Sequence, residues 1–296
     1  MKKSALKPVK NILVTGAHGQ LGEEIKRHCQ KEGRVLVFTD HTDLDITDVR
    51  AINSFFEKYT FDCCINAAAY TAVDKAEEDV EKAFLVNAKA PEALAGICKE
   101  YDCQLIHIST DFVFDGKTSV PYQEEDATAP LSVYGKSKRE GEQAVMATHP
   151  GAWIFRTSWL YSTQGSNFVK TMLRLGKEKE QLGVIADQIG TPTYAKDLAL
   201  LLDRALDISK EEGVPGGVYH FSNEGVASWY DFAHAIFEYS GTKVQLLPIN
   251  TLQYPTPATR PNYSVMDKTK VKETFRISIR HWREALNECI NQLLKS

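Results

Sequence analysis

The stretch Asn11–Gly22 reads NILVTGAHGQLG and joins a short apolar run to a glycine-rich turn. Its first five residues are typical of a buried strand, and the glycines at positions 16, 19 and 22 then precede a helical pattern. Because glycine has no side chain, such a turn lets the backbone approach a diphosphate closely, and the N–H groups that begin the helix can bind the phosphates. An ordinary glycine turn is the alternative interpretation. The place between a strand and a helix favours a dinucleotide site formed by Gly16, Gly19, Gln20, Leu21 and Gly22.

Short apolar runs alternate with helical patterns in the sequence that follows this stretch. The predicted strands are Arg34–Thr39, Asp62–Ala67, Gln104–Ser109 and Ala152–Thr157. The predicted helices between them are Val49–Tyr59, Asp74–Glu100 and Tyr134–Thr148. Alternation of this kind predicts an α/β fold with a doubly wound, Rossmann-like parallel sheet. Ligands of such folds bind outside the carboxyl ends of the strands, so the residues that end each strand are the candidates for chemistry.

The second half of the sequence is less regular and predicts a smaller C-terminal lobe that binds the substrate. Helical patterns cover Tyr194–Leu206, Trp229–Ser240 and about Ile279–Leu294, and short strands are expected at Val218–Phe221 and Val244–Pro248. Three prolines make Tyr254–Pro261 an extended loop. We assign residues 1–160 and roughly 192–222 to the dinucleotide-binding domain, and roughly 161–191 and 223–296 to the substrate-binding lobe.

Composition and charge exclude several classes of protein. The 296 residues include 35 Lys and Arg and 39 Asp and Glu, and there is no long basic tract to indicate a nucleic-acid partner. The longest apolar run, Leu198–Leu202, is far shorter than the about 20 residues of a membrane-spanning helix. The N-terminal MKKSALKPVKN lacks the apolar segment of a signal peptide. None of the six cysteines forms a CxxC pair, so we expect reduced thiols, no metal site of cysteines and a cytoplasmic protein.

Acidic residues after the second predicted strand bear on the choice of cofactor. Asp40 ends that strand, and an acid at this point accepts hydrogen bonds from a ribose 2′-hydroxyl and repels a 2′-phosphate. Asp40 therefore favours NADH over NADPH, with a solvated carboxylate at a strand end as the alternative. Asp45 and Ile46 follow closely and are placed to flank an adenine, although Asp45 or Asp48 can equally cap the next helix.

A tyrosine and a lysine four residues apart, Tyr134 and Lys138, begin the helix after the fourth predicted strand. Residues with this spacing share one face of a helix. A phenol has a pKa of about 10, and a neighbouring ammonium stabilises the phenolate and lowers that pKa. Thr110, directly after the fourth strand, could hydrogen-bond a substrate carbonyl beside the phenol and polarise it for hydride attack. The alternatives are an exposed helix face for the pair and a simple turn for Thr110.

With these motifs the sequence resembles the extended short-chain dehydrogenase/reductases and, among them, the dTDP-4-dehydrorhamnose reductase family. The resemblance covers essentially the whole chain. The stretches that carry it are Asn66–Glu77 (NAAAYTAVDKAE), Ser109–Gly116 (STDFVFDG), Tyr134–Lys138 (YGKSK), Phe155–Tyr161 (FRTSWLY), Asn167–Leu175 (NFVKTMLRL), Asp187–Thr193 (DQIGTPT) and Arg260–Asp267 (RPNYSVMD).

The resemblance implies an enzyme that uses NADH or NADPH to reduce the C4 keto group of dTDP-4-dehydro-β-L-rhamnose, the last step of dTDP-rhamnose biosynthesis. It implies Tyr134 as the proton donor, Lys138 as the residue that lowers its pKa and holds the nicotinamide ribose, and Thr110 as a second contact to the carbonyl. Besides Tyr134 and Lys138, it places Ala69, Tyr70 and Thr71 at the cofactor. Besides Thr110, it places Asp111, Trp159, Asn167, Gln188 and Arg260 at the dTDP-sugar. It leaves open a homodimer and a bound Mg²⁺, for which we assign no residue.

Two other functions are compatible with such a resemblance. Some relatives with this fold are non-catalytic regulatory subunits that bind nucleotide without turnover, and others reduce a different 4-keto deoxysugar nucleotide. The presence of Thr110, Tyr134 and Lys138 together favours an enzyme, because a scaffold has no need of all three. His18, within the glycine turn, is a residue for which the resemblance offers no role.

Overall fold

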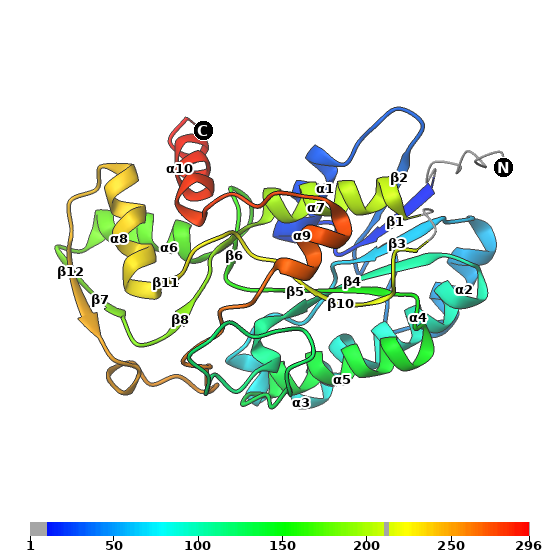
Figure 1. The fold of residues 1–296 in the computed structure, drawn as a ribbon, viewed down its shortest axis with the longest axis horizontal. Coiled ribbons are helices and arrows are strands. Elements are labelled where there is room, and N and C mark those ends of the chain that lie inside the picture. The colour runs from blue at the N-terminus through cyan, green and yellow to red at the C-terminus, as the bar shows by residue number, and fades with distance from the viewer. Residues whose placement is uncertain (1–10, 210–212, 296) are drawn as a thin grey trace.

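The computed structural model describes residues 11–209 and 213–295. The segment MKKSALKPVKN, in which we expect no signal peptide, lies outside the described residues, apart from Asn11. None of the helices that the structure describes is long and apolar enough to cross a membrane. Figure 1 shows a sheet-containing domain on the right and a smaller lobe on the left, next to the carboxyl end of the chain.

A parallel sheet with the strand order β2-β1-β3-β4-β5-β10 forms the centre of the larger domain. Its strands are β1 Asn11–Thr15, β2 Val35–Thr39, β3 Cys63–Asn66, β4 Gln104–Thr110, β5 Trp153–Thr157 and β10 Gly217–His220. Each of them overlaps a predicted strand. The chain changes direction in the sheet between β1 and β3, and doubly wound folds bind their ligands at such a switch point.

Helices cover both faces of this sheet. One face is covered by α1 Gln20–His28, α7 Ala195–Ile208 and α9 Thr269–Phe275, and the other by α2 Val49–Lys58, α4 Ala90–Glu100 and α5 Val133–Thr148. Because side chains alternate along a strand, Ile12 and Val14 of β1 enter the first core whereas Leu13 enters the second. The predicted doubly wound α/β fold is therefore confirmed.

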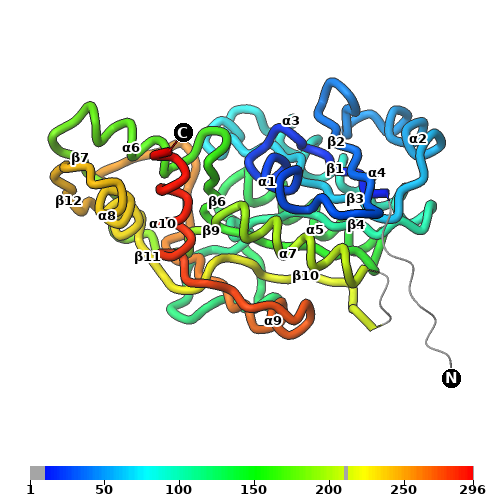
Figure 2. Tube along the Cα trace, turned by 90° about the horizontal axis from the view of Figure 1, so that it is seen from above, coloured from blue at the N-terminus to red at the C-terminus, as the bar shows by residue number. Residues whose placement is uncertain are grey.

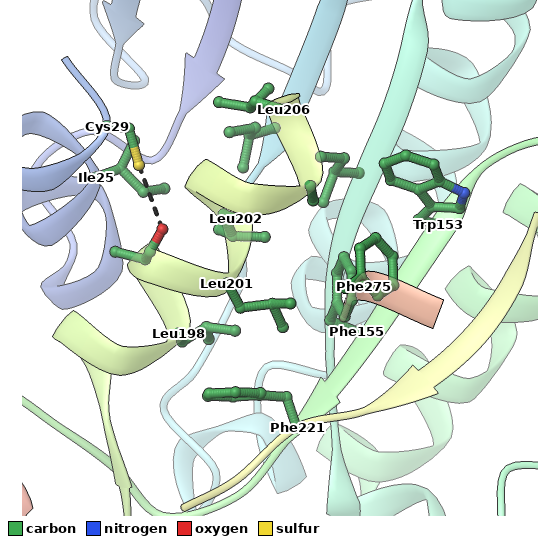
Figure 3. Close-up of a cluster of buried hydrophobic side chains, with 14 of the residues drawn as sticks. Ile25, Cys29, Trp153, Phe155, Leu198, Leu201, Leu202, Leu206, Phe221 and Phe275 are labelled. Carbon is green, nitrogen blue, oxygen red and sulfur yellow. Dashed lines mark hydrogen bonds between the residues drawn. The ribbon is translucent and has the colours of Figure 1, made fainter. Parts of the chain in front are cut away.

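The first core includes a helix from the C-terminal part of the chain. Figure 3 shows Leu198, Leu202 and neighbouring side chains of α7 near Phe155 of β5. Phe275 of α9 lies in the same cluster, with its ring centroid 5.3 Å from that of Trp153 and 5.4 Å from that of Phe155. Thus α9 packs on the sheet, although it falls within the range 223–296 that we assigned to the lobe from the sequence.

The smaller lobe has a core of its own, which includes Met172, Phe232 and Leu286. Its elements are α6 Phe168–Glu178, β7 Gln181–Ile185, β8 Ile189–Gly190, β11 Ala227–Ser228, α8 Trp229–Ser240, β12 Gln245–Ile249, the 3-10 helix η4 Thr251–Gln253 and α10 Trp282–Leu293. Two short strands, β6 Leu160–Tyr161 and β9 Thr193–Tyr194, pair where the chain passes between the two parts. Figure 2 shows the lobe at one end of the molecule and α2 near the other.

The segment 74–100, predicted as one helix, is divided in the structure. It consists of the 3-10 helix η1 Lys75–Glu77, α3 Val80–Phe84, the π-helical segment η2 Leu85–Lys89 and α4. A π-helical turn adds a residue to the helical repeat and is frequent at functional sites. Here it places the side chain of Asn87 in the interior, where it is fully buried.

Candidate active site

The glycine turn lies at the carboxyl end of β1, at the switch point of the sheet. Gly16 has a φ of +72°, and a Cβ at this position would lie 2.7 Å from the backbone nitrogen of Ala68. A Cβ on Gly22 would lie 2.4 Å from the carbonyl oxygen of Gly16. Gly19 is the N-cap of α1, and no side chain caps this helix. The N-terminus of α1 is therefore not capped by a side chain, and such a helix start favours a bound anion, such as a diphosphate.

Asp40 lies beside this turn, at the end of β2. Its carboxylate accepts hydrogen bonds from the backbone nitrogen and the hydroxyl of Thr42, each at 2.7 Å, and lies 3.0 Å from Nε2 of His18. The hydrogen bonds with Thr42 lower the pKa of Asp40 to about 2. Asp45 accepts from Thr47 in the same way. Asp40 is thus a charged group at the edge of the turn.

Two other residues predicted at the cofactor serve the packing of this region. Leu21 is 5% exposed and belongs to the first core. Ile46 is 7% exposed and belongs to the second core. Leu21 and Ile46 thus anchor the glycine turn and the loop after β2 to the two hydrophobic cores.

Tyr134 and Lys138 lie on the first two turns of α5. Ser132 caps this helix by accepting a hydrogen bond from the backbone nitrogen of Gly135 at 3.1 Å. A Cβ on Gly135 would lie 2.3 Å from the carbonyl oxygen of Phe112, so the absence of a side chain lets α5 lie against the 3-10 helix η3 Asp111–Val113. The structure thereby brings Tyr134 next to Thr110, which ends β4.

Burial controls the protonation of the Tyr134 and Lys138 side chains. It raises the pKa of Tyr134 to about 12, while a hydrogen bond with Thr110 acts in the opposite direction. It lowers the pKa of Lys138 to about 8. The lysine ammonium donates to the carbonyl oxygen of Ile108 at 2.6 Å. In this geometry the pKa of the phenol is therefore above its ordinary value, whereas the sequence pattern predicted that Lys138 lowers it.

Asp111 is a buried acid next to Thr110. It is 2% exposed, and its Oδ1 accepts a hydrogen bond from the Thr110 hydroxyl at 3.1 Å. No donor among the described residues lies in hydrogen-bond geometry with its Oδ2, although the nearby Ser264 hydroxyl acts to lower the pKa of the carboxyl. Burial raises the pKa of Asp111 to about 6. A buried carboxyl oxygen without a partner is suited to accept a hydrogen bond from a sugar hydroxyl.

The chain that leaves β3 carries Ala69, Tyr70 and Thr71, which we predicted at the cofactor. The backbone nitrogen of Tyr70 donates to Asn87 at 2.8 Å, and the Asn87 amide donates back to the Tyr70 carbonyl at 3.0 Å. The same amide lies 3.0 Å from the hydroxyl of Ser137 on α5. Asn87 therefore joins the loop after β3 to the helix of Tyr134. We did not predict this residue, and its signal was a lone amide within an apolar helical pattern.

Trp159 occupies an unusual position between the two parts of the molecule. It has a φ of +47°, which is rare for a bulky side chain and often marks a functional site. Its ring stacks on Trp229, with a centroid distance of 3.6 Å. A Cβ on Gly190 would lie 2.7 Å from the Trp159 ring, so this glycine makes room for the stack.

The other three residues predicted at the substrate already make hydrogen bonds within the protein. Asn167 caps α6 and donates to Gln20 at 2.9 Å. Gln188 is buried and donates to Thr251 at 3.1 Å. The two terminal nitrogens of Arg260 donate to the carboxylate of Asp74 at 3.0 and 2.7 Å. The guanidinium predicted for a diphosphate is thus paired with an acid in this structure.

The described residues also bear on metals and on the cysteines. Across residues 11–209 and 213–295 no group of three or more His, Cys, Asp or Glu side chains is arranged to hold a metal ion. All six cysteines are free thiols and buried.

Comparisons with known proteins identify the family. The model of the RmlD substrate binding domain matches residues 10–295. The dTDP-4-dehydrorhamnose reductase of Aggregatibacter actinomycetemcomitans is 44% identical over 283 residues, which is 93% of this chain and 96% of that protein. The chain belongs to the dTDP-4-dehydrorhamnose reductase family. The resemblance seen in the sequence is therefore confirmed.

Solved structures of dTDP-4-dehydrorhamnose reductases agree with this assignment. The enzyme of Clostridium acetobutylicum has a TM-score of 0.91 at 43% identity and covers 96% of this chain and 99% of its own. The enzyme of Bacillus anthracis, solved in complex with NADP, has a TM-score of 0.91 at 37% identity with the same coverage. Membership of the dTDP-4-dehydrorhamnose reductase family supports the prediction of an oxidoreductase and does not favour a non-catalytic regulatory subunit.

Proposed function

We propose that this chain reduces the C4 keto group of dTDP-4-dehydro-β-L-rhamnose and releases dTDP-β-L-rhamnose. The observation that carries the proposal is the grouping of Thr110, Tyr134 and Lys138 at the carboxyl end of β4, in a chain of the reductase family. A bound nicotinamide dinucleotide supplies the hydride that adds to the carbonyl carbon.

The protein side chains polarise the carbonyl, donate the proton and stabilise the resulting phenolate. The hydroxyl of Thr110, which donates to Asp111 in the structure, would turn its single hydrogen to the substrate carbonyl oxygen and polarise the C=O bond. As the C–H bond forms, the oxygen becomes an alkoxide and takes the proton from the Tyr134 hydroxyl. The ammonium of Lys138 stabilises the phenolate that is left, so that proton transfer becomes feasible near neutral pH. Solvent then returns a proton to Tyr134.

The fit of the glycine turn supports binding of the dinucleotide. The turn and α1 would hold the diphosphate, and Lys138 would hold the nicotinamide ribose. Asp40, charged because of its low pKa, would accept from the 2′-hydroxyl of the adenosine ribose. We therefore propose a preference for NADH, while a relative has been solved with NADP. The adenine would lie near Asp45 and Ile46, and the chain at 69–71 would pass the cofactor.

The lobe would hold the dTDP-sugar. The free Oδ2 of Asp111 would accept from a sugar hydroxyl, and Trp159 would lie beside the substrate. Arg260 would serve the diphosphate only if it shared its hydrogen bonds with Asp74 or exchanged them. We also propose a cytoplasmic location, which six reduced and buried thiols suit. A homodimer and Mg²⁺ binding stay predictions from the resemblance.

The experiment that tests this function is the oxidation of NADH or NADPH in the presence of the 4-keto sugar nucleotide. Tyr134→Phe is expected to lower kcat at least ~10²-fold and to change the dissociation constant of the cofactor far less. Tyr59→Phe, which removes an exposed hydroxyl at the C-cap of α2, is the matched control and should keep full activity. Full activity of Tyr134→Phe would contradict the mechanism. No turnover of this sugar by the wild type, with turnover of another 4-keto deoxysugar nucleotide, would contradict the substrate.

A further inference from the structure

Three polar side chains form a buried row across the sheet. Thr15 of β1 and Asn66 of β3 are partners in the strand register, and so are Asn66 and His107 of β4. Each of the three is at most 1% exposed. The Thr15 hydroxyl lies 2.7 Å from Oδ1 of Asn66, and Nδ2 of Asn66 lies 3.1 Å from Nδ1 of His107. The row runs from the strand of the glycine turn toward α5.

Lys138 continues this row from α5. Its Nζ lies 3.4 Å from Nε2 of His107 and donates to the carbonyl oxygen of Ile108. Among the residues that the structure describes, no carboxylate forms an ion pair with Nζ, and the charge of Glu142 acts on it only through space. His107 is therefore the side chain that can accept a hydrogen bond from this buried ammonium.

The hydrogen bonds along this row can run in either of two directions. Burial and the nearby lysine hold the pKa of His107 well below its usual range, so the ring is neutral and carries one N–H. An ammonium only donates. If Nε2 accepts from it, the hydrogen is on Nδ1 and must point to the oxygen of the Asn66 amide. With the amide as the structure places it, Nδ1 accepts and Nε2 carries the hydrogen, which matches an uncharged lysine.

We propose that His107 is a positioning residue that accepts a hydrogen bond from Lys138 through Nε2 and so keeps the lysine charged beside Tyr134. The Asn66 amide then turns its oxygen toward Nδ1–H and donates to Thr15, whose hydroxyl serves equally as donor or acceptor. When Lys138 loses its charge, the hydrogen bonds along the row change direction. Nδ1 of His107 then accepts from Asn66 and Nε2 carries the hydrogen, as in the structure.

The charge of Lys138 is sensitive to such a contact. Burial brings its pKa to about 8, close to a working pH, so one hydrogen bond to the charged form changes how much ammonium is present. Other titratable groups on the neighbouring elements act elsewhere or more weakly. Glu142 on α5 raises the pKa of Lys138 through space, Asp111 on η3 acts on Tyr134, and Glu77 on η1 accepts from the backbone of Val133.

The kinetic consequence rests on the proposed reductase function and is tested by the pH dependence of kcat/KM. His107→Leu removes the acceptor at similar volume, and we expect its activity to fall about fivefold at pH 8 but to approach the wild type at pH 6.5, because one lost hydrogen bond lowers the lysine pKa from about 8 by about one unit. His107→Gln retains an acceptor and should restore most of the activity at pH 8. An equal loss at every pH, or the same profile for both variants, would overturn the proposal.

A second measurement needs neither substrate nor turnover. In the chain labelled with ¹⁵N-histidine, NMR reports which ring nitrogen carries the hydrogen, and His107→Gln identifies the signal of His107. We expect the hydrogen on Nδ1 at pH 6.5 and on Nε2 after Lys138 has lost its charge at higher pH, with no such change in Lys138→Met. A hydrogen on Nε2 at pH 6.5 would refute the proposal for His107, whatever the assays with sugar nucleotides show.

Discussion

Asp111 is a buried acid whose ionisation opposes folding. Its pKa is raised to about 6, against about 3.9 in an unfolded chain, so between these values the native state binds more protons and stability falls as the pH rises. Asp111→Asn is therefore expected to raise the free energy of unfolding by up to about 3 kcal/mol at pH 7.5 and to change it little near pH 4. Urea unfolding at the two pH values measures both. The same gain at both would show that the carboxylate charge is not the cause.

The proposed preference for NADH predicts a measurable effect of the single side chain of Asp40. Asp40→Asn removes the charge that favours a ribose hydroxyl and repels a 2′-phosphate, so the ratio of kcat/KM for NADH to that for NADPH should fall about tenfold. Asp43→Asn makes the same change of charge three residues later and serves as the control. An unchanged ratio in Asp40→Asn, or an equal fall in the control, would contradict the role of Asp40.

At the scale of elements, α5 carries Tyr134 and Lys138 and packs closely on the π-helical segment η2. A Cβ on Gly141 would lie 2.0 Å from the carbonyl oxygen of Asn87, which is backbone and cannot move alone. Gly141→Ala should cost at least about 2 kcal/mol of stability and lower kcat, because α5 must shift. Gly96→Ala on α4, where the nearest atom outside its own helix lies at 3.8 Å, should instead stabilise by about 0.5–1 kcal/mol. Urea unfolding of the two variants should show opposite signs.

The elements also show what a sequence can and cannot predict here. The strands of the sheet and the pair Tyr134–Lys138 were predictable, because apolar runs and a spacing of four act within one element. The row of Thr15, Asn66 and His107 was not predictable. It depends on the register between neighbouring strands, which the sequence pattern does not determine. The pairing of Arg260 with Asp74 joins residues 186 positions apart. The π-helical turn at Asn87 was hidden because a 3.6-residue period continues on both sides of it.

At the scale of the whole molecule, Asp197 ties the lobe to the sheet domain. From α7 it accepts hydrogen bonds from Arg280, just before α10, at 2.8 and 2.9 Å and from Asn223 at 2.6 Å. Asp197→Ala leaves both donors without this partner and should lower the free energy of unfolding by about 2 kcal/mol, less than for a fully buried pair because Arg280 is partly exposed.

The matched control for this prediction is the exposed pair Arg174–Glu178 on α6, which lies wholly within the lobe. Glu178→Ala should change the stability by less than about 0.5 kcal/mol. Denaturation followed by circular dichroism and by fluorescence compares the variants. Equal effects of the two substitutions would show that the Asp197 contacts do not hold the lobe and the sheet together.

The strand order has a consequence for synthesis on the ribosome. β10, which completes the sheet beside β5, is translated only after α6, β7 and α7. Until then a nascent chain presents β5, with Trp153 and Phe155, as an open edge that can pair with another chain. A gene cut after β5 would leave that edge permanently unpaired. A single truncation therefore cannot separate the complete nucleotide-binding sheet from the lobe, because its last strand is encoded beyond the first part of the lobe.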